Sequence, residues 1–266
     1  MNENILSYYK LGQESSRLSG ASLERARTES ILRRFLPRPP ATVLDVGGAD
    51  GAYAFPLSKE GYEVHLVDLI PLHIEQAREK SQSSGIRLAS ITVGDARQLR
   101  FSDQCADAVL YFGPLYHLDS VSERSAALRE ARRTLKPGGI FLGAFISRFA
   151  SLLDGVRSHF LENEQFGKIV DGDLKSGQHR NPTDNPAYFT NAYFHHPAEA
   201  KSEVQEVGFK NVRLLSVEGP FWLVSDIQEQ LEKPEVSQRI LEYMERIEAE
   251  VELIGSSAHF IAVAEK

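Results

Sequence analysis

The chain has 266 residues, of which 42% are hydrophobic and 25% charged, a balance typical of a soluble globular protein with one large domain or two small ones. Acidic residues outnumber basic residues by 37 to 30, which gives a net charge of −7 and argues against nucleic-acid binding through phosphate neutralisation. The single cysteine excludes an intramolecular disulfide. A polar amino-terminal segment and the lack of an apolar run of about 20 residues argue against a secretory leader and a membrane span. We therefore expect a cytoplasmic protein that does not bind membranes.

From Ala41 onward, short apolar runs alternate with longer amphipathic segments, the pattern of parallel strands joined by crossover helices. Strands are predicted at residues 43–46, 64–67, 90–93, 108–112, 140–146, 212–217 and 260–264. Helices are predicted at 23–35, 52–59, 71–80, 120–135, 149–160 and 197–207. One more helix carries Ile240, Leu241, Met244, Ile247 and Val251 on one face. These elements predict an α/β, Rossmann-like, doubly wound sheet of seven mainly parallel strands with helical cap segments.

We expect the whole chain, residues 1–266, to form a single domain. Residues 1–40 would be an amino-terminal helical flap, and residues 41–147 the ligand-binding core of the sheet. Residues 148–196 would be a cap insertion, because they interrupt the alternation of strands and helices. Residues 197–266 would complete the sheet and carry a helical insertion.

A glycine-rich segment, Asp45-Val46-Gly47-Gly48-Ala49-Asp50-Gly51, directly follows the first predicted strand. Small residues at 47, 48, 49 and 51 let the backbone turn tightly and approach a ligand closely. In open α/β sheets, ligands bind at the carboxyl ends of the strands near the point where the strand order reverses. This segment is therefore the first candidate binding loop.

The later strands end in acidic and aromatic residues that would reach the same edge of the sheet. Asp68 ends the second strand, 23 residues after Asp45, and is followed by Leu69; Asp95-Ala96-Arg97 follows the third and Phe112-Gly113 the fourth. An acid at the end of the second strand suits the hydroxyls of a ribose. A dinucleotide phosphate would meet like charge from Asp45 and Asp50, whereas a ligand with an ammonium and a sulfonium group would be favoured. S-adenosylmethionine has both groups.

The loop after the first strand, the acid at position 68 and Gly94-Asp95-Ala96 resemble a class I S-adenosylmethionine-dependent methyltransferase over roughly residues 40–147. Leu135-Lys136-Pro137-Gly138-Gly139 is similar to the same family, and Gly113-Pro114-Leu115-Tyr116-His117-Leu118 resembles a bacterial branch that acts on small molecules. Ala49 departs from the family pattern, which usually has glycine there. The resemblance implies methyl transfer by in-line displacement to an oxygen or nitrogen atom of a small organic molecule, with S-adenosylhomocysteine as the product. It implies cofactor contacts at Asp45, Gly47, Gly48, Ala49, Gly51, Asp68, Leu69, Asp95, Ala96, Arg97, Phe112 and Gly113.

The catalytic candidates lie at the end of the fourth strand and in the cap. His117, with its neighbour Tyr116, is a candidate base or substrate contact, or alternatively a histidine packed at a helix start. His195 either faces the substrate or caps the helix that starts at Pro197. Tyr9 is a candidate flap residue over the cofactor, or alternatively part of the core. Arg27 either reaches the methionine carboxylate of the cofactor or is an ordinary solvated helix charge.

Two other functional classes use the same sheet. An NAD-dependent oxidoreductase would normally carry Gly-x-Gly-x-x-Gly, whereas Ala49 and Ala52 take the later glycine positions here. A non-catalytic S-adenosylmethionine-binding protein would bind the cofactor without turnover. No pair of histidines has metal-ligand spacing with nearby acids, so no metal is expected. The partner is expected to be a small-molecule methyl acceptor, whose identity stays open, and the chain to be a monomer or a homodimer.

Overall fold

The computed structural model describes residues 23–183 and 185–266. Tyr9 and the first part of the expected flap lie outside these residues. Contacts group the chain into two compact units. Unit 1 comprises the described part of residues 1–31, Phe145–Ala200 and Leu214–Ile261; unit 2 comprises Leu32–Ala144, Lys201–Arg213 and Ala262–Lys266. These groups differ from the four segments expected from the sequence, and the expected division into core and cap stays a prediction.

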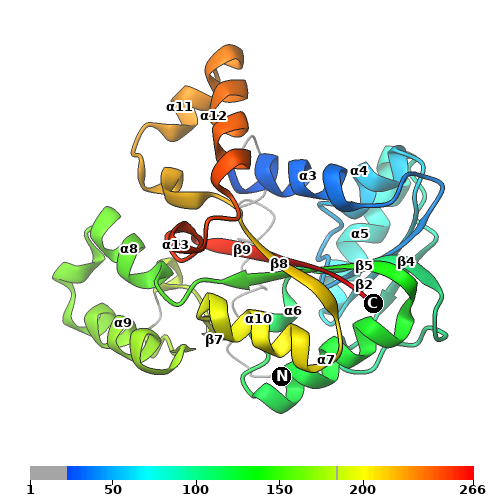
Figure 1. Cartoon of the computed structure of the whole chain (residues 1–266), viewed down its shortest axis with the longest axis horizontal. Helices are drawn as coiled ribbons and strands as arrows, with labels where there is room; N and C mark the ends of the chain where they lie inside the picture. The colour runs from blue at the N-terminus through cyan, green and yellow to red at the C-terminus, as the bar shows by residue number, and fades with distance from the viewer. Residues whose placement is uncertain (1–22, 184) are drawn as a thin grey trace. The chain divides into compact units, whose positions relative to one another are not determined.

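The seven-stranded sheet has the strand order β3-β2-β1-β4-β5-β9-β8 (Figure 1). Its strands are β1 Thr42–Val46, β2 Glu63–Asp68, β3 Ser90–Val93, β4 Ala106–Tyr111, β5 Leu135–Ile146, β8 Lys210–Ser216 and β9 His259–Glu265. The pairs β1–β2, β1–β4, β2–β3 and β4–β5 are all parallel. Strand order reverses between β1 and β4, so the carboxyl ends of these two strands flank the point where such sheets bind ligands. The predicted doubly wound, mainly parallel sheet is therefore confirmed.

The central strand β1 is buried along almost its whole length. Val43, Leu44 and Val46 are at most 1% exposed, as expected for a parallel strand that helices cover on both faces. Asp45 differs from these apolar residues of β1, because it is acidic and yet fully buried. An acid in such a position needs a functional or structural explanation.

The helices of unit 2 begin near the signals seen in the sequence. They are α4 Ala54–Lys59, α5 Pro71–Ser84, α6 Pro114–His117 and α7 Val121–Thr134. Helix α5 has the expected proline in its first turn, but it continues to Ser84, beyond the predicted end at residue 80, and stops at Gly85, which has φ of 69°. Helix α7 has the predicted capping box, in which Ser120 Oγ accepts from the Glu123 amide and the Glu123 carboxylate accepts from the Ser120 amide.

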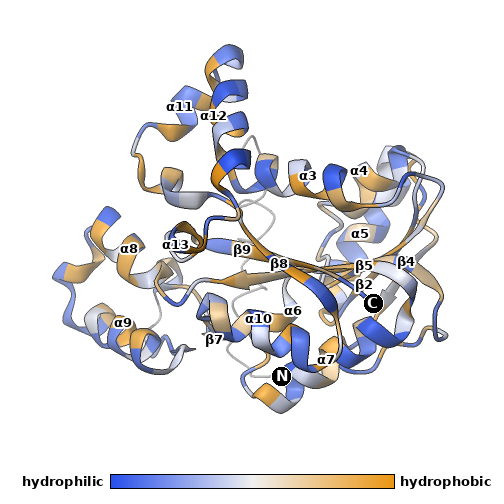
Figure 2. Ribbon diagram, in the orientation of Figure 1, coloured by the Kyte–Doolittle hydropathy of each residue, from blue (hydrophilic) through white to orange (hydrophobic). Residues whose placement is uncertain are grey.

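Unit 1 contains most of the remaining elements. They are α8 Ala150–Arg157, η1 Phe160–Glu162, α9 Glu164–Ser176, β6 Gln178–His179, η2 Pro186–Tyr188, β7 Ala192–Tyr193, η3 Gly219–Leu223, α11 Ile227–Leu231, α12 Pro234–Ile247 and α13 Val251–Ile254. Helix α3 (Leu23–Phe35) and helix α10 (Pro197–Glu206) contribute residues to both units. Figure 2 shows α12 carrying hydrophobic and hydrophilic residues along its length; its Met244 packs with Leu23 and Ile227 in a buried cluster.

A buried polar group links three elements of the expected cap. The Asp173 carboxylate on α9 accepts from Ser151 Oγ on α8 at 2.5 Å and lies 2.9 Å from His179 Nδ1 on β6. His179 Nε2 lies 2.8 Å from the carbonyl oxygen of Tyr188. Because all of these side chains are buried, the hydrogen bonds replace the water that each group would lose on folding.

Three expectations about element boundaries are wrong. Helix α12 ends at Ile247, and Val251 lies in α13 with 77% of its surface exposed, so Val251 does not share the apolar face of α12. Helix α8 ends at Arg157, and Val156 is 62% exposed, so the predicted apolar face from 149 to 160 is shorter. Strand β5 begins at Leu135 directly after α7, because Pro137 and the glycines after it continue the strand instead of forming a separate turn.

Candidate functional site

The loop after β1 depends on glycine because the protein's own atoms fill the space that a side chain would need. Gly47 has φ of +78°, and a Cβ there would lie 2.5 Å from Pro114 Cδ. A Cβ on Gly48 would lie 2.4 Å from Leu66 Cδ1 and 2.5 Å from Asp45 Oδ2. Gly51 has φ of +85°. The protein's own packing therefore requires small residues at 47, 48 and 51, because neighbouring side chains lie directly against the loop.

Asp68, at the end of β2, fixes this loop through the backbone of Ala49. Asp68 Oδ2 accepts from the Ala49 amide at 2.9 Å, while Oδ1 accepts from the Ile70 amide at 2.8 Å and lies 3.2 Å from His73 Nδ1. Ala49 has φ of 48°, a left-handed conformation that costs a non-glycine residue energy. The hydrogen bond to Asp68 offsets part of this cost. The structure thus brings together the loop and the acid that the sequence placed on successive strands.

Asp45 is the most unusual group at this edge of the sheet. It is 0% exposed, and neither carboxylate oxygen has a hydrogen-bond partner among the described residues. Burial, followed by the negative charge of Asp68, raises the pKa of Asp45 from 3.8 to about 7; Asp50 adds to the shift and the Ala54 amide opposes it. The region around Asp45 therefore favours positive charge, whether it comes from a proton or from a ligand.

Asp95, after β3, is paired with the side chain two residues later. Its carboxylate accepts from Arg97 NH2 at 2.6 Å and from the Arg97 amide at 2.8 Å. Arg97 also bonds Glu123 on α7 at 2.5 Å. The Arg97 guanidinium holds the pKa of Asp95 below its usual value, so Asp95 stays ionised. Contact of Asp95 and Arg97 with a cofactor stays a prediction.

The segment after β4 lies against the loop after β1. A Cβ on Gly113, which has φ of +135°, would lie 3.3 Å from the Gly47 carbonyl oxygen. Phe112 makes an edge-to-face contact with Tyr53, with ring centroids 5.4 Å apart. Residues 47, 112 and 113, predicted separately from two strand ends, therefore lie together.

Tyr116 and His117 are the last two residues of α6, three and four residues after Gly113. Their ring centroids lie 4.7 Å apart; Tyr116 is buried and His117 is half-buried. The helix start places both rings just beyond the carboxyl end of β4. Their catalytic roles stay predictions.

Leu69 and Ala96 differ in their exposure. Leu69 is 39% exposed, directly after Asp68, so it offers an apolar surface beside that carboxylate. Ala96 is buried, and its carbonyl oxygen accepts from Tyr111 Oη at 2.9 Å.

Two candidate residues, His195 and Arg27, belong to unit 1. His195 is 0% exposed and packs edge to face with Phe145 and Tyr193, at centroid distances of 4.8 and 4.6 Å. Arg27 is also 0% exposed; NH2 donates to Glu248 at 2.5 Å and Nε to the Val217 carbonyl at 3.2 Å. The interpretation of Arg27 as a solvated helix charge is therefore wrong. Tyr9 lies outside the described residues.

Sequence reasoning missed the contacts that three residues make at the site. His73 contacts Asp68, Pro114 fills the space over Gly47, and Tyr53 contacts Phe112. Pro114 had a usable signal, since it directly follows a glycine at a strand end. His73 and Tyr53 had none, because their contacts depend on how a helix lies on its strand.

Comparison with known proteins agrees with this geometry. Residues 44–143 match the family model described as a methyltransferase domain. A ubiquinone/menaquinone biosynthesis C-methyltransferase of Caulobacter sp. strain K31 is 33% identical over 129 residues, 45% of this chain and 50% of that protein. A ubiquinone biosynthesis O-methyltransferase of Paramagnetospirillum magneticum is 33% identical over 124 residues, 47% of each chain. The chain thus spans about half the length of the curated relatives it matches.

A solved structure shares the fold over nearly the whole chain. It is a methyltransferase of Thermotoga maritima described as a possible histamine N-methyltransferase, with a TM-score of 0.58, 18% identity and coverage of 98% of both chains. Across the residues that the structure describes, no helix has the length and apolar character to cross a membrane. The family match favours a methyltransferase over the alternative of an NAD-dependent oxidoreductase. Residues 44–143 of the chain therefore match a methyltransferase domain, and the chain shares its fold with a solved methyltransferase structure.

Proposed function

We propose that the protein transfers a methyl group from S-adenosylmethionine to an oxygen or nitrogen atom of a small organic molecule. The observation that carries the proposal is the arrangement at the carboxyl ends of β1 and β2. There the buried Asp45 lies under a glycine loop whose Ala49 amide is bonded to Asp68. The match of residues 44–143 to a methyltransferase domain supports the same activity.

The residues present fit this cofactor. Asp45, Asp50 and Asp68 interact electrostatically and favour a ligand with positive charge, as the ammonium and sulfonium groups provide. A carboxylate offers about four acceptor positions, and Asp68 uses three of them within the protein. It can accept one ribose hydroxyl directly, and a second by releasing one of its present donors. The exposed side chain of Leu69 would cover one face of the adenine.

The catalytic task of the protein is to orient the acceptor and to receive its proton. When bound, S-adenosylmethionine supplies a methyl group that is already activated by its sulfonium. Precise alignment alone contributes up to roughly 7–11 kcal/mol in the best-oriented reactions. We assign proton acceptance to His117, beside Tyr116, because a hydroxyl acceptor loses a proton as the carbon–oxygen bond forms. A positioned base contributes about 10²–10⁴-fold.

Similar proteins methylate different kinds of atom. The names of the two curated relatives specify carbon and oxygen, and that of the solved structure suggests nitrogen. The acceptor site therefore has to be found by experiment. A cytoplasmic location and a monomeric or homodimeric state stay predictions.

Calorimetric titration with S-adenosylmethionine tests cofactor binding. We expect the native protein to bind and Asp68→Asn to bind at least about tenfold more weakly, a loss of about 1.4 kcal/mol, because one charged acceptor for the ribose is lost. Asp103→Asn is the matched control, since its side chain is 72% exposed and pairs with Arg133 at the surface. Absence of binding by the native protein would refute the proposal.

Turnover is tested by release of S-adenosylhomocysteine with a panel of hydroxyl, amine and activated-carbon acceptors. We expect a hydroxyl or amine compound to support release, and His117→Ala to lower kcat with a hydroxyl acceptor by about 10²-fold or more. A carbon acceptor would keep methyl transfer but overturn the proposed atom. Cofactor binding without release by any acceptor would favour a non-catalytic binding protein.

A further inference from the structure

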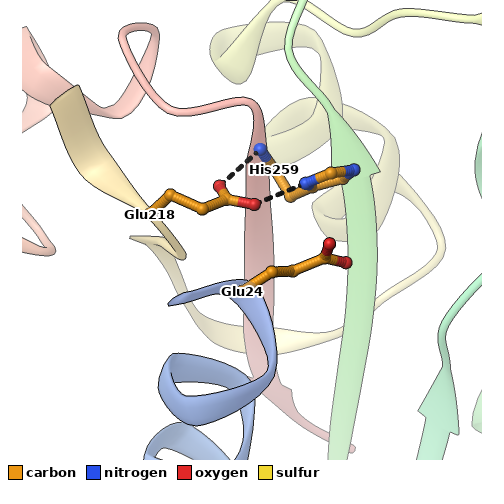
Figure 3. A group of neighbouring side chains, drawn as sticks. All are labelled: Glu24, Glu218 and His259. Carbon is orange, nitrogen blue, oxygen red and sulfur yellow. Dashed lines mark hydrogen bonds and ion pairs between the residues drawn. The ribbon is translucent and has the colours of Figure 1, made fainter. Parts of the chain in front are cut away.

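Three side chains that commonly bind metal ions converge in unit 1, outside the group around Asp45. Glu24 belongs to α3, Glu218 follows β8, and His259 begins β9. One ligand atom from each lies within 4.8 Å of the other two. Figure 3 shows the Glu218 and Glu24 carboxylates both directed toward the imidazole of His259. Residues 24, 218 and 259 are far apart in the sequence, so their convergence is a property of the fold.

Glu218 is held rigidly in this cluster. Its side chain is 5% exposed. Oε2 accepts from Ser257 Oγ at 2.8 Å and from the His259 amide at 2.9 Å, while Oε1 lies 2.6 Å from His259 Nδ1. Hydrogen bonds of this kind orient a ligating carboxylate and are typical of the groups that surround bound metals.

The ligand set of the cluster suits a cation. Two carboxylates lie beside one imidazole, so the cluster offers two anionic oxygen ligands and one nitrogen ligand. A divalent ion matches the charge of two such carboxylates.

We propose that Glu24, Glu218 and His259 bind a divalent transition-metal ion. One nitrogen and two oxygen ligands suit Zn²⁺ or a similar first-row ion better than Mg²⁺ or Ca²⁺, which prefer oxygen ligands only. Two ligand atoms at about 2.1 Å from a tetrahedral metal ion lie roughly 3.4 Å apart. The ion would take the place of the proton between Glu218 Oε1 and His259 Nδ1, and their 2.6 Å separation would widen to admit it. Rotation of the Glu24 side chain brings in the third ligand.

This site differs from the sequence-based expectation of no metal. That expectation considered histidines with local ligand spacing, whereas these ligands come from one helix and the facing ends of two strands. A metal here would link α3 to the segments around β8 and β9. We therefore expect it to stabilise unit 1. This expectation does not depend on the proposed methyl transfer.

Zn²⁺ titration of the full chain, freed of metal by dialysis against a chelator, tests the proposal by calorimetry. We expect the native protein to bind Zn²⁺, and Glu24→Gln to weaken the site by at least about tenfold, the lower end of the loss seen even for outer-shell changes. Glu29→Gln is the matched control, because Glu29 lies on the same helix and pairs with Arg25 at the surface. It should bind Zn²⁺ as the native protein does.

Two further measurements keep the test independent of folding and of activity. Zn²⁺ should raise the Tm of the native protein and of Glu29→Gln, with a much smaller rise for Glu24→Gln, because a ligand stabilises the state that binds it. Co²⁺ should give visible ligand-field absorption that is lost in His259→Gln, with circular dichroism to check that this variant is folded. Lack of Zn²⁺ binding by the native protein, or equal affinity in Glu24→Gln, would overturn the proposal. Neither result would bear on S-adenosylmethionine binding at Asp45 and Asp68.

Discussion

Asp45 is an acid inside a buried strand, and its ionisation is therefore linked to folding. Its pKa is about 7 in the folded chain against 3.8 for a free side chain. Between these values the folded chain holds a proton that the unfolded chain has lost, so the free energy of unfolding falls as the pH rises. Below the unfolded value both states are protonated and above about pH 7 both are ionised, so the change is confined to that window. Its size is on the order of a few kcal/mol.

Urea unfolding at about pH 5 and about pH 8 measures this linkage. We expect a smaller difference in the free energy of unfolding between the two pH values in Asp45→Asn, because the titrating group is gone. Any effect of the amide that is the same at both pH values cancels in this difference. Asp103→Asn is the control, since its exposed carboxylate should leave the loss unchanged. An equal pH dependence in the native protein and Asp45→Asn would contradict the account.

At the residue scale, the sequence predicts positions well but hydrogen-bond partners poorly. Asp68 and the glycine loop could be predicted as neighbours because parallel strands end at the same edge of a sheet. The partners of Arg27 could not, because Val217 and Glu248 are 190 and 221 residues away. Arg97 is an intermediate case: its pairing with Asp95 is local, but the bond to Glu123 depends on the position of α7.

The turn from β1 into α4 depends on the absence of a side chain at position 48. Gly48→Ala would place a methyl group 2.4 Å from Leu66 Cδ1 and 2.5 Å from Asp45 Oδ2. Both neighbours are themselves fully buried. Relief requires a shift of the loop or of β2, so we expect a loss of about 1–3 kcal/mol in the free energy of unfolding, measured in urea.

Gly167→Ala is the matched control for this variant. Gly167 lies inside α9, and a Cβ there would meet no atom within 4 Å beyond its chain neighbours and the backbone of its own helix. Alanine in a helix interior is about 0.5–1 kcal/mol more favourable than glycine, so this variant should be more stable than the native protein. A similar effect of the two substitutions would mean that crowding is not what fixes glycine at position 48.

Element boundaries were predictable where the end signal is local. The capping box of α7 and the proline that opens α5 both act within one turn. Gly85, which ends α5, is an equally local signal, but the predicted end at residue 80 did not use it. The end of α12 has no such signal: the apolar spacing continues to Val251, yet the helix stops at Ile247. Glu248, directly after it, bonds Arg27, so a tertiary contact fixes the chain at this point and overrides the pattern.

At the scale of the whole molecule, the doubly wound, mainly parallel character of the sheet followed from the alternation of strands and helices. The two compact units did not follow, because β5, β8 and β9 each contribute residues to both. A division that cuts across single strands leaves no linker or change of composition in the sequence. It depends on which side chains the two ends of each strand contact.

The buried ion pair between Arg27 and Glu248 tests how strongly unit 1 depends on contacts between distant segments. Their side chains are 0% and 4% exposed. Arg27→Met removes the guanidinium and leaves a buried carboxylate, so we expect a loss of about 3–5 kcal/mol in the free energy of unfolding. Arg25→Met on the same helix is the control: its pair with Glu29 is 32% and 25% exposed, and the loss should stay below about 1 kcal/mol.

The same variant tests whether the two units unfold together. The single tryptophan, Trp222, lies in unit 1, so its fluorescence reports on that unit, whereas far-ultraviolet circular dichroism reports on the whole chain. Since three strands contribute to both units, we expect Arg27→Met to lower the urea midpoint of both signals equally. A shift of the fluorescence midpoint alone would show that unit 1 unfolds independently, despite the shared strands. A loss no larger than that of Arg25→Met would mean that the buried pair does not hold α3 in place.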